Sequence, residues 1–439
     1  MIKLPKEAQL IIEKLNQAGF SAYIVGGCVR DSLLGLKPLD WDICTSALPE
    51  ETKRVFSSHH IIETGILHGT ITVRINHKSF EITTFRTDGE YEDYRHPKAV
   101  EFVSDITEDL SRRDFTVNAM AYHPTMGLVD MFSGQEDLSR KIIRCVGEPT
   151  TRFQEDALRI MRGLRFAGVY GFSIEEKTKE AMFSCRELLT KIAAERISVE
   201  LKKLLVSEFT EKILLEYRDI IATVVPEIAP MFDLEQKNPY HQYDVWKHTI
   251  YSVGYAEKNL IVRLAVLFHD IGKPQTFSVD KKGICHFYSH AALGETICET
   301  VLRRLKFDVK TINSVKELVK YHDAQIEPTE KAVKRWLQKI GEEQFERLLY
   351  VKEADAKTTF FSDEKLQVIS EIRRVFQTVF EQNACFSLKD LNLSGTDLIA
   401  LGLPEGKIIG ETLSRLLELV MDNKIENTKE SLLAYLKNE

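Results

Sequence analysis

The sequence lacks close cysteine pairs and long apolar runs. Its seven cysteines lie far apart among 439 residues, and none has the CxxC spacing of thiolate zinc sites or suggests a disulfide framework. No segment approaches the roughly 18 consecutive apolar residues of a membrane span, and charges interrupt the N-terminal stretch every few positions. We therefore expect a cytoplasmic protein with reduced thiols and no membrane partner.

The sequence also lacks an excess of positive charge, an internal repeat and a low-complexity linker. Its formal net charge is −7 at pH 7, so contact with a nucleic acid would have to use a local basic face. Hydrophobic residues make up 44% and charged residues 28%, which is typical of globular proteins. At roughly 150 residues per domain, the length predicts about three domains.

Strand and helix signals alternate at the start of the chain, whereas helical periodicity dominates later. We predict a helix over residues 7–18, strands over 22–25 and 41–44, and a hairpin around the turn at 76–78. From about Arg144 the strand signals fade, which predicts helices to the C-terminus. The expected fold class is therefore α+β, with a mixed sheet and helices first and an all-helical remainder.

Two aspartates, Asp40 and Asp42, alternate on a predicted strand that follows a glycine pair. Because residues i and i+2 of a strand share a face, their charges would repel unless a cation lay between them. Carboxylates suit Mg²⁺, and Glu81 on a neighbouring strand could be a third. The turn at Gly26 and Gly27 opens a short helix whose N–H groups could hold a triphosphate. This pattern predicts nucleotidyl transfer, although a lone DxD is more often a solvated strand end.

The matching pattern extends well beyond these residues. The segments GGCVRDSLLG, LDWDICT, FRTDGEYEDYRHP, VEFVSDITEDLSRRDFTVNAMAY and EDALRIMRGLRFA occur in this order. Together they resemble the class II CCA-adding and poly(A) polymerase nucleotidyltransferases, members of the polymerase-β-like superfamily. The resemblance implies that CTP and ATP are used, without a nucleic-acid template, to add CMP, CMP and AMP to the 3′ end of tRNA. It also implies that Asp40 and Asp42 hold two Mg²⁺ ions.

In the resembled family, an EDxxR motif acts as a protein template for the incoming base. Carried over, Asp156 and Arg159 would pair with the base, and Glu155 would hold Arg159. The chemistry is suitable, because a carboxylate can accept from the amino group of cytosine or adenine and a guanidinium can donate to ring acceptors. Arg162 shares a helix face with Glu155 and Arg159. From the residues alone, an intrahelical ion pair between Asp156 and Arg159 is the simpler interpretation.

The resemblance assigns further residues to the nucleotide. Arg113 and Asp114 would lie by the ribose and triphosphate, with Asn118 as an additional candidate, and Arg30 belongs to the glycine motif. Residues 87–97 match a loop that full CCA-adding and A-adding enzymes keep and that CC-adding enzymes shorten. His96 stands where the family commonly has a second arginine, so this loop would change its charge near neutral pH.

A second set of residues begins at YDVWKHTIYSV and continues through LIVRLAVLFHDIGKP. Adjacent His and Asp offer one nitrogen and one oxygen ligand to a metal. With the histidines around it, HDIGKP resembles the HD phosphohydrolase domain. The resemblance implies a divalent metal on His248, His269, Asp270 and Asp355, with His290 and His322 on a second metal or on phosphate, where Lys273 could also act. Such domains could trim 2′,3′-cyclic or 3′-phosphate ends; a degenerate fold that only supports tRNA binding is the alternative.

These signals predict four parts. They are a nucleotidyltransferase head over residues 1–143, a helical neck for nucleotide selection and RNA binding over 144–235, an HD domain over 236–362 and a helical tail over 363–439. An A-adding enzyme and a poly(A) polymerase remain alternatives, the latter disfavoured by the acidic balance and the absence of a basic tail. An HD phosphohydrolase with a vestigial transferase head and a pure RNA-binding module are alternatives from other classes.

Overall fold

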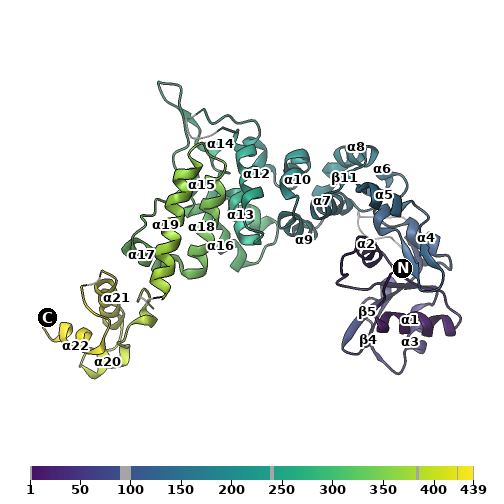
Figure 1. Ribbon diagram of the computed structural model, residues 1–439, viewed down its shortest axis with the longest axis horizontal. Coiled ribbons are helices and arrows are strands. Elements are labelled where there is room, and N and C mark those ends of the chain that lie inside the picture. Colours follow the sequence, from purple (N-terminus) through teal and green to yellow (C-terminus); the bar gives the residue numbers. More distant parts are fainter. Residues whose placement is uncertain (1, 89–99, 238–241, 382–384, 423, 439) are drawn as a thin grey trace. The chain divides into compact units, whose positions relative to one another are not determined.

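The structure, a computed structural model, describes residues 2–88, 100–237, 242–381, 385–422 and 424–438. The chain divides into two compact units, Met1–Pro226 and Glu227–Glu439 (Figure 1). The first unit contains the main sheet, and the second consists mostly of helices, as the α+β prediction requires. Among the described residues, no helix is both long enough and apolar enough to cross a membrane.

A seven-stranded mixed sheet with the order β3-β4-β5-β2-β1-β8-β9 forms the centre of the head. Its strands are β1 (Ala22–Val25), β2 (Ile43–Thr45), β3 (His60–Ile62), β4 (Thr70–Ile75), β5 (Lys78–Thr84), β8 (Ala121–His123) and β9 (Gly127–Val129). The pair β2 and β5 is parallel, and the other neighbours are antiparallel. Helices α1 (Lys6–Gln17) and α3 (Pro49–Val55) pack side by side against this sheet (Figure 1).

The hairpin between β4 and β5 confirms the prediction for this segment. Ile71, Val73 and Ile75 of β4 are buried while the residues between them are not, which is the alternation of a strand with one face on the core. Asn76 and His77 turn the chain with φ of 49° and 63°. Two consecutive positive φ values give the turn whose twist matches that of the flanking strands.

The first unit continues with short helices around the sheet and a helical segment after it. The helices are α2 (Gly27–Leu33), α4 (Ile106–Ser111), α5 (Gly134–Arg140), α6 (Pro149–Glu155), α7 (Leu158–Tyr170), α8 (Glu176–Cys185), α9 (Ala194–Leu205), α10 (Thr210–Glu216) and α11 (Arg218–Val224). Short 3₁₀ segments in this unit are η1 (Ile66–His68), η2 (Thr116–Asn118) and η3 (Arg186–Lys191); η4 (Pro226–Met231) begins at the last residue of the unit, and η5 (Leu388–Asp390) belongs to the second unit.

Short strands also occur outside the main sheet. They form the pairs β6 (Arg86–Asp88) with β7 (Val100–Phe102), β10 (Ile142–Ile143) with β11 (Ser173–Ile174), and β12 (Ser278–Val279) with β13 (Cys285–His286). The prediction that the chain is all-helical after Arg144 is therefore wrong at β11, β12 and β13. Strands of two residues are too short to show an alternating pattern in the sequence, so periodicity could not reveal them.

The second unit is built from helices, three of which pack on one apolar helix. The helices are α12 (Val245–Tyr255), α13 (Leu260–Phe268), α14 (Lys273–Thr276), α15 (His290–Arg304), α16 (Val309–Tyr321), α17 (Glu330–Ile340), α18 (Glu342–Ala356), α19 (Ser362–Glu381), α20 (Gly395–Ala400), α21 (Lys407–Met421) and α22 (Lys429–Lys437). Helix α13 is apolar on nearly all sides and packs against α12, α16 and α18. Asn259 caps its first turn, and the helix ends at His269, as the sequence predicts.

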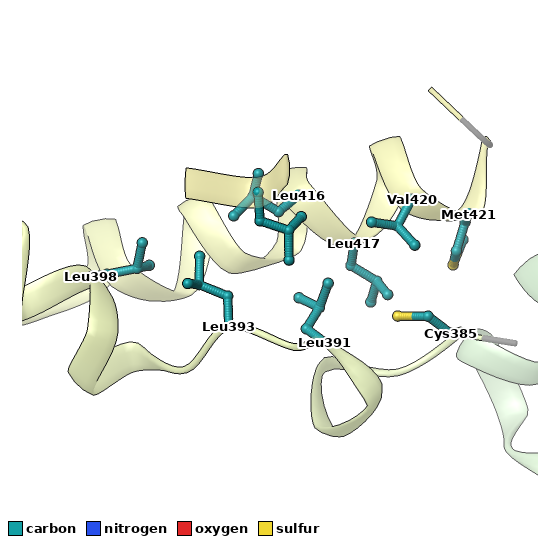
Figure 2. Packing of buried hydrophobic residues seen from close by; sticks show 9 residues of the cluster. Cys385, Leu391, Leu393, Leu398, Leu416, Leu417, Val420 and Met421 are labelled. Atoms are coloured by element: carbon teal, nitrogen blue, oxygen red, sulfur yellow. The ribbon is translucent and has the colours of Figure 1, made fainter. Parts of the chain in front are cut away.

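The C-terminal helices share a small apolar core of their own. Nine buried residues form it (Figure 2): Cys385, Leu391, Leu393, Leu398, Leu416, Leu417, Val420, Met421 and Leu432. They come from α20, α21, α22 and the loops before them, so this segment packs around its own cluster.

Candidate functional site

The paired aspartates lie just before β2 and not within it. The strand begins at Ile43, so the predicted start at residue 41 is wrong. The N–H of Val25 nevertheless donates to the carbonyl oxygen of Asp42 at 3.0 Å, which continues the pairing of β1 and β2 by one residue. Because Ile43 pairs with Ile82 across the parallel strands, Asp42 is brought beside Glu81.

Three carboxylates gather negative charge at this edge of the sheet. The surrounding protein atoms and the charges of Glu81 and Asp40 raise the pKa of Asp42, against the opposing effect of Arg113. Their mutual repulsion suits the binding of a divalent cation. In the described part of the chain, however, the three carboxylates do not bring three oxygens within 4.8 Å of one another. The three carboxylates are therefore suitable metal ligands, but their oxygens are too far apart to coordinate one ion together in this arrangement.

The glycine turn before α2 leaves space for an arginine. Gly26 has a φ of +78°, and a Cβ at this position would lie 2.9 Å from Nη1 of Arg113. Glycine is thus required both for backbone conformation and for the approach of the guanidinium. Arg113 donates to buried Asp109 at 3.1 Å, while its Nε is buried without a hydrogen-bond partner among the described residues. Arg113 therefore places a positive charge over the glycine turn, and its Nε–H remains available to donate a hydrogen bond.

Four of the predicted nucleotide-binding residues are connected to one another. Arg30 donates to the side-chain oxygen of Asn118, whose amide nitrogen donates to Asp114 at 3.1 Å. The guanidinium of Arg162 lies 2.6 Å from the same Asp114 carboxylate. Burial opposes the charge of Asp114, but Arg162 and Asn118 lower its pKa to about 2. The network therefore holds a charged carboxylate between Arg162 and Asn118 at neutral pH.

The EDxxR motif spans a break between two helices. Helix α6 ends at Glu155, Asp156 is extended (φ −139°, ψ 101°), and α7 begins at Leu158. The continuous helix that the sequence predicts is thus interrupted, because the Asp156 carboxylate accepts the N–H of Leu158 at 3.1 Å and competes with helix formation. Arg159 pairs with Glu155 at 2.7 Å and is buried.

The intrahelical ion pair between Asp156 and Arg159 is absent, so that interpretation is wrong. Asp156 instead binds the guanidinium of Arg196 at 2.8 and 3.3 Å. Arg196 lies on α9, 40 residues further on, and sequence reasoning missed it because nothing local marks such a pairing. His96 and most of the loop at 87–97 lie outside the described residues.

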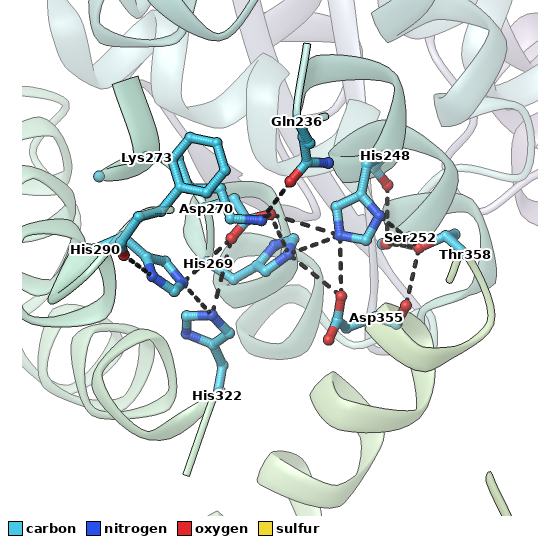
Figure 3. A network of polar contacts seen from close by, with 12 residues as sticks. Gln236, His248, Ser252, His269, Asp270, Lys273, His290, His322, Asp355 and Thr358 are labelled. Carbon is cyan, nitrogen blue, oxygen red and sulfur yellow. Dashed lines mark hydrogen bonds and ion pairs between the residues drawn. The ribbon is translucent and has the colours of Figure 1, made fainter. Parts of the chain in front are cut away.

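The second unit brings six predicted ligands together around one carboxylate (Figure 3). They come from α12, α15 and α18 and from the ends of α13 and α16: His248, His269, Asp270, His290, His322 and Asp355. One oxygen of Asp270 lies 3.5 Å from His248 and 3.2 Å from His269. Its other oxygen lies 3.5 Å from His290 and 4.0 Å from His322. Asp355 lies 3.0 Å from His248.

These residues form two groups of three ligand atoms within 4.8 Å that share Asp270. One group adds His248 and His269, and the other adds His290 and His322. An arrangement with a shared carboxylate can hold two metal ions side by side. A pocket of about 560 Å³ opens onto the cluster.

The four imidazole rings are oriented by hydrogen bonds at Nδ1. The acceptors lie at 2.7–2.8 Å: Val266 O for His269, Phe287 O for His290, Val319 O for His322 and the Thr358 hydroxyl for His248. A carbonyl oxygen only accepts, so Nδ1 of three rings carries the proton. Their Nε2 atoms therefore point toward Asp270, the ring orientation expected of metal-ligating histidines.

The electrostatics of the cluster favour neutral His248 and His322 and a charged Asp270. Burial opposes the charge of His269, but Asp270 and Asp355 raise its pKa. Burial lowers the pKa of His248, and burial together with His269 lowers the pKa of His322 to about 3. Burial opposes the charge of Asp270, but His269 and Lys273 hold its pKa well below the usual range. Lys273 lies 2.7 Å from Asp270 and 2.8 Å from Gln236. A divalent cation needs neutral imidazoles and a charged carboxylate, so its binding would displace a proton from His269.

Three family models match successive parts of the chain. They are the Poly A polymerase head domain at residues 22–144, the RNA and SrmB-binding site of polymerase A at 171–232, and domain 2 of tRNA nucleotidyltransferases at 276–436. The head model thus covers the sheet and the glycine turn, and the second covers Arg196.

Individual relatives agree with these matches. The CCA-adding enzyme of Lactobacillus delbrueckii subsp. bulgaricus is 48% identical over 224 residues, 51% of this chain and 55% of that protein, so the match spans about half of its length. The Bacillus stearothermophilus CCA-adding enzyme, solved in complex with CTP, is 30% identical with a TM-score of 0.72 over 99% of this chain and 96% of that chain.

A further relative is similar over almost the whole chain. The CCA-adding enzyme of Enterococcus faecalis is 32% identical over 446 residues, which cover 99% of this chain and 96% of that protein. By this match, the chain belongs to the family of CCA-adding enzymes, which are nucleotidyltransferases.

Proposed function

We propose that the chain is a CCA-adding tRNA nucleotidyltransferase, which adds CMP, CMP and AMP to the 3′ end of tRNA from CTP and ATP. The observation that carries this proposal is the grouping of Asp40, Asp42 and Glu81 beside the glycine turn and Arg113. The head of this chain thus combines a cation site with donors for a triphosphate. The Bacillus stearothermophilus relative, solved in complex with CTP, supports the choice of nucleotide.

Different residues of the head would bind the triphosphate and the metal ion. Gly26, Gly27 and Arg113 would contact the triphosphate, because the turn leaves room for a close approach and Arg113 has a free donor. Enzymes of this family use a divalent metal. We assign Mg²⁺ to Asp40 and Asp42, with Glu81 as a possible third carboxylate; when bound, it would activate the tRNA 3′-hydroxyl and neutralise the leaving pyrophosphate.

The connected network and the helix break would position the ribose and the base. Arg30, Asn118, Asp114 and Arg162 form a fixed set of donors and acceptors for the sugar and phosphates. Asp156 would accept from the amino group of cytosine or adenine, and Arg159, held by Glu155, would donate to the ring. GTP and UTP present the wrong edges to this pair.

A direct test gives the protein Mg²⁺, CTP and ATP with two tRNA transcripts, one ending at the discriminator base and one already carrying CC. We expect sequencing of the 3′ ends to find CCA completed on both. Addition of a single A to the second alone would make the protein an A-adding enzyme. Long A tails on both would make it a poly(A) polymerase.

The histidine cluster supports a second activity, metal-dependent hydrolysis of phosphate esters at RNA 3′ ends. A divalent metal held by His248, His269, Asp270 and Asp355, with a second at His290 and His322, would supply an activated water. His269→Ala should remove metal and phosphohydrolase activity while CCA addition continues. Loss of both activities would refute separate sites, and a cluster that binds no metal would leave this region a support for tRNA binding.

We assign these activities to a head at 1–143, a neck at 144–235, an HD domain at 236–362 and a tail at 363–439. The seven cysteines are free and buried, which supports a reducing cytoplasm as the working compartment. The intact head residues speak against a vestigial transferase.

A further inference from the structure

A second pocket adjoins the pocket above the histidine cluster. It has a volume of about 320 Å³ and lies between α18, α19 and the segment after α16. Four residues line both pockets: His322, Asp323, Asp355 and Lys365. Two of these belong to the proposed metal ligands, so the second pocket opens directly beside the cluster.

The second pocket has an apolar wall and a polar edge. Ile326, Ile369 and Ile372 are buried in the wall, and Val368 adds a side chain that is 43% exposed. Such aliphatic surfaces accommodate a planar ring, since ring burial gains apolar contact without needing a polar partner. The wall therefore suits a nucleobase better than a charged or extended group.

The polar edge supplies two lysines, Lys352 and Lys365, and two carboxylates, and Lys352 already donates to the carbonyl oxygen of His322 at 2.8 Å. The ammonium group of Lys365 forms no hydrogen bond or ion pair within the described part of the chain, although it lies where the two pockets meet. Asp323 and Glu364 are exposed beside it. An unpaired lysine at this junction attracts an anion, and the carboxylates can accept from ribose hydroxyls or an amino group.

We propose that this pocket binds the nucleoside of a phosphate ester whose phosphate lies against the histidine cluster and Lys365. The inference rests on the proposed phosphohydrolase activity toward 3′-phosphate and 2′,3′-cyclic phosphate ends, and it adds a binding site for the nucleoside that carries the phosphate. The volume is at the lower end of the roughly 300–1,000 Å³ of small-ligand sites, so it holds one nucleoside at a time. In hydrolysis of the 3′-phosphate, water forms the new P–O bond, the bond to the nucleoside oxygen breaks, and that oxygen takes a proton from the water.

The test compares ester hydrolysis by the metal-loaded full chain with three substrates. Adenosine 3′-phosphate and an RNA ending in a 3′-phosphate carry the nucleoside, and glycerol 2-phosphate carries none. Val368→Glu places a charge on the apolar wall, and Ser370→Glu places the same charge on an exposed position of α19 outside the pocket. The two variants thus differ in where the charge lies.

We expect Val368→Glu to raise KM for the nucleoside substrates about tenfold and to leave glycerol 2-phosphate unchanged. Ser370→Glu should change none of the three. If both variants have the same KM as each other for every substrate, the proposal that this pocket binds the nucleoside is wrong. A raised KM for free adenosine 3′-phosphate but not for the RNA would restrict the site to free nucleotides, and the reverse would restrict it to RNA ends.

Lys365 is tested separately because it should act on the phosphate. Lys365→Ala should raise KM several-fold for all three substrates, Lys365→Arg should restore most of the affinity, and Arg374→Ala, an exposed cation on the same helix, should have no effect. If Lys365→Ala leaves the KM values unchanged, Lys365 does not bind the phosphate.

A binding measurement separates failure of the pocket from failure of hydrolysis. If no divalent metal supports ester hydrolysis, the phosphohydrolase proposal fails. Calorimetric titration with adenosine 3′-phosphate then still tests the pocket, because a head-bound nucleotide contributes equally to both variants. Loss of one binding event in Val368→Glu but not in Ser370→Glu supports the pocket, and identical titrations overturn it.

Discussion

The head and the histidine cluster arrange their charged groups in opposite ways. In the head, Asp40, Asp42 and Glu81 are exposed and do not converge on a common point. In the cluster, His248, His269 and Asp270 are almost fully buried and already lie within coordination distance of one another.

The difference reflects how each site would receive its cation. A nucleotide brings phosphate oxygens that complete the coordination of Mg²⁺, so the head needs few fixed ligands. A buried cluster must supply nearly all ligands from the protein, and unpaired buried charges are costly unless the geometry is set beforehand. The head is therefore expected to depend on single carboxylates, and the cluster on the groups that orient its rings.

The largest effect is expected at the head. Asp42→Ala should lower CCA addition by at least about 10²-fold, because it removes a ligand that no protein group can replace. Ester hydrolysis by the cluster should continue unchanged. The measurement is single-nucleotide addition of CMP to tRNA, with Glu108→Gln as an exposed control in the same unit. Equal losses in both variants would contradict the assignment.

A smaller effect is expected from the second layer of the cluster. Thr358→Val removes the acceptor for Nδ1 of His248 and should weaken metal binding by about 10–100-fold. Competition with a chelator of known affinity measures this change. Thr300→Val, an exposed site on α15, is the matched control. Unaltered affinity in Thr358→Val would show that ring orientation does not limit this site.

Asp114 tests whether the head also contains preorganised charge. Its pKa in the folded protein is about 2, so its ion pair with Arg162 stabilises the fold at neutral pH. The sign follows from linkage: a lowered pKa gives stability above the unfolded value near 4, lost as pH falls through about 2. Asp114→Asn should lower the free energy of unfolding by about 2 kcal/mol at pH 7 and about half as much at pH 3.

Urea unfolding at the two pH values measures this difference, with Asp219→Asn as an exposed control. An equal loss at both pH values would assign the effect of Asp114→Asn to packing and not to charge.

The smallest effect is expected at the base-selecting pair. Arg196→Ala releases both oxygens of Asp156 and should reduce the preference for CTP over UTP about tenfold, because Asp156 loses its fixed position. Arg196→Lys should restore part of the preference. Misincorporation of UMP measures this preference. A purely structural role of Arg196 would instead lower the incorporation of all nucleotides alike. Lys203→Ala on the same helix is the control, and an unchanged preference in Arg196→Ala would exclude the positioning role.

Sequence reasoning succeeded where signals are local or the family motif is long. The strand at Ala22–Val25, the hairpin turn at Asn76 and the end of α13 at His269 follow from periodicity and turn chemistry. Ligands as distant as His248 and Asp355 could be grouped only through the HD resemblance, since spacing alone does not show that α12 and α18 pack together.

The missed features depend on tertiary contacts. The break at Asp156 and its partner Arg196 are 40 residues apart, and the Thr358 hydroxyl meets His248 across 110 residues. An aspartate side chain can bond a nearby backbone N–H and interrupt a helix, or it can point to solvent and leave the helix continuous. The local sequence does not show which of the two occurs.

The histidine hydrogen bonds have a further consequence. His269, His290 and His322 each bond the carbonyl oxygen three residues earlier, and for His269 and His322 this oxygen lies in the last turn of α13 and α16. The rings of His269 and His322 therefore cap the C-terminal ends of α13 and α16. Fraying of either end would rotate the corresponding ring away from the cluster. Occupancy by a metal would then slow local opening, and amide hydrogen exchange near residues 266–270 and 319–323 would report it without any assay of catalysis.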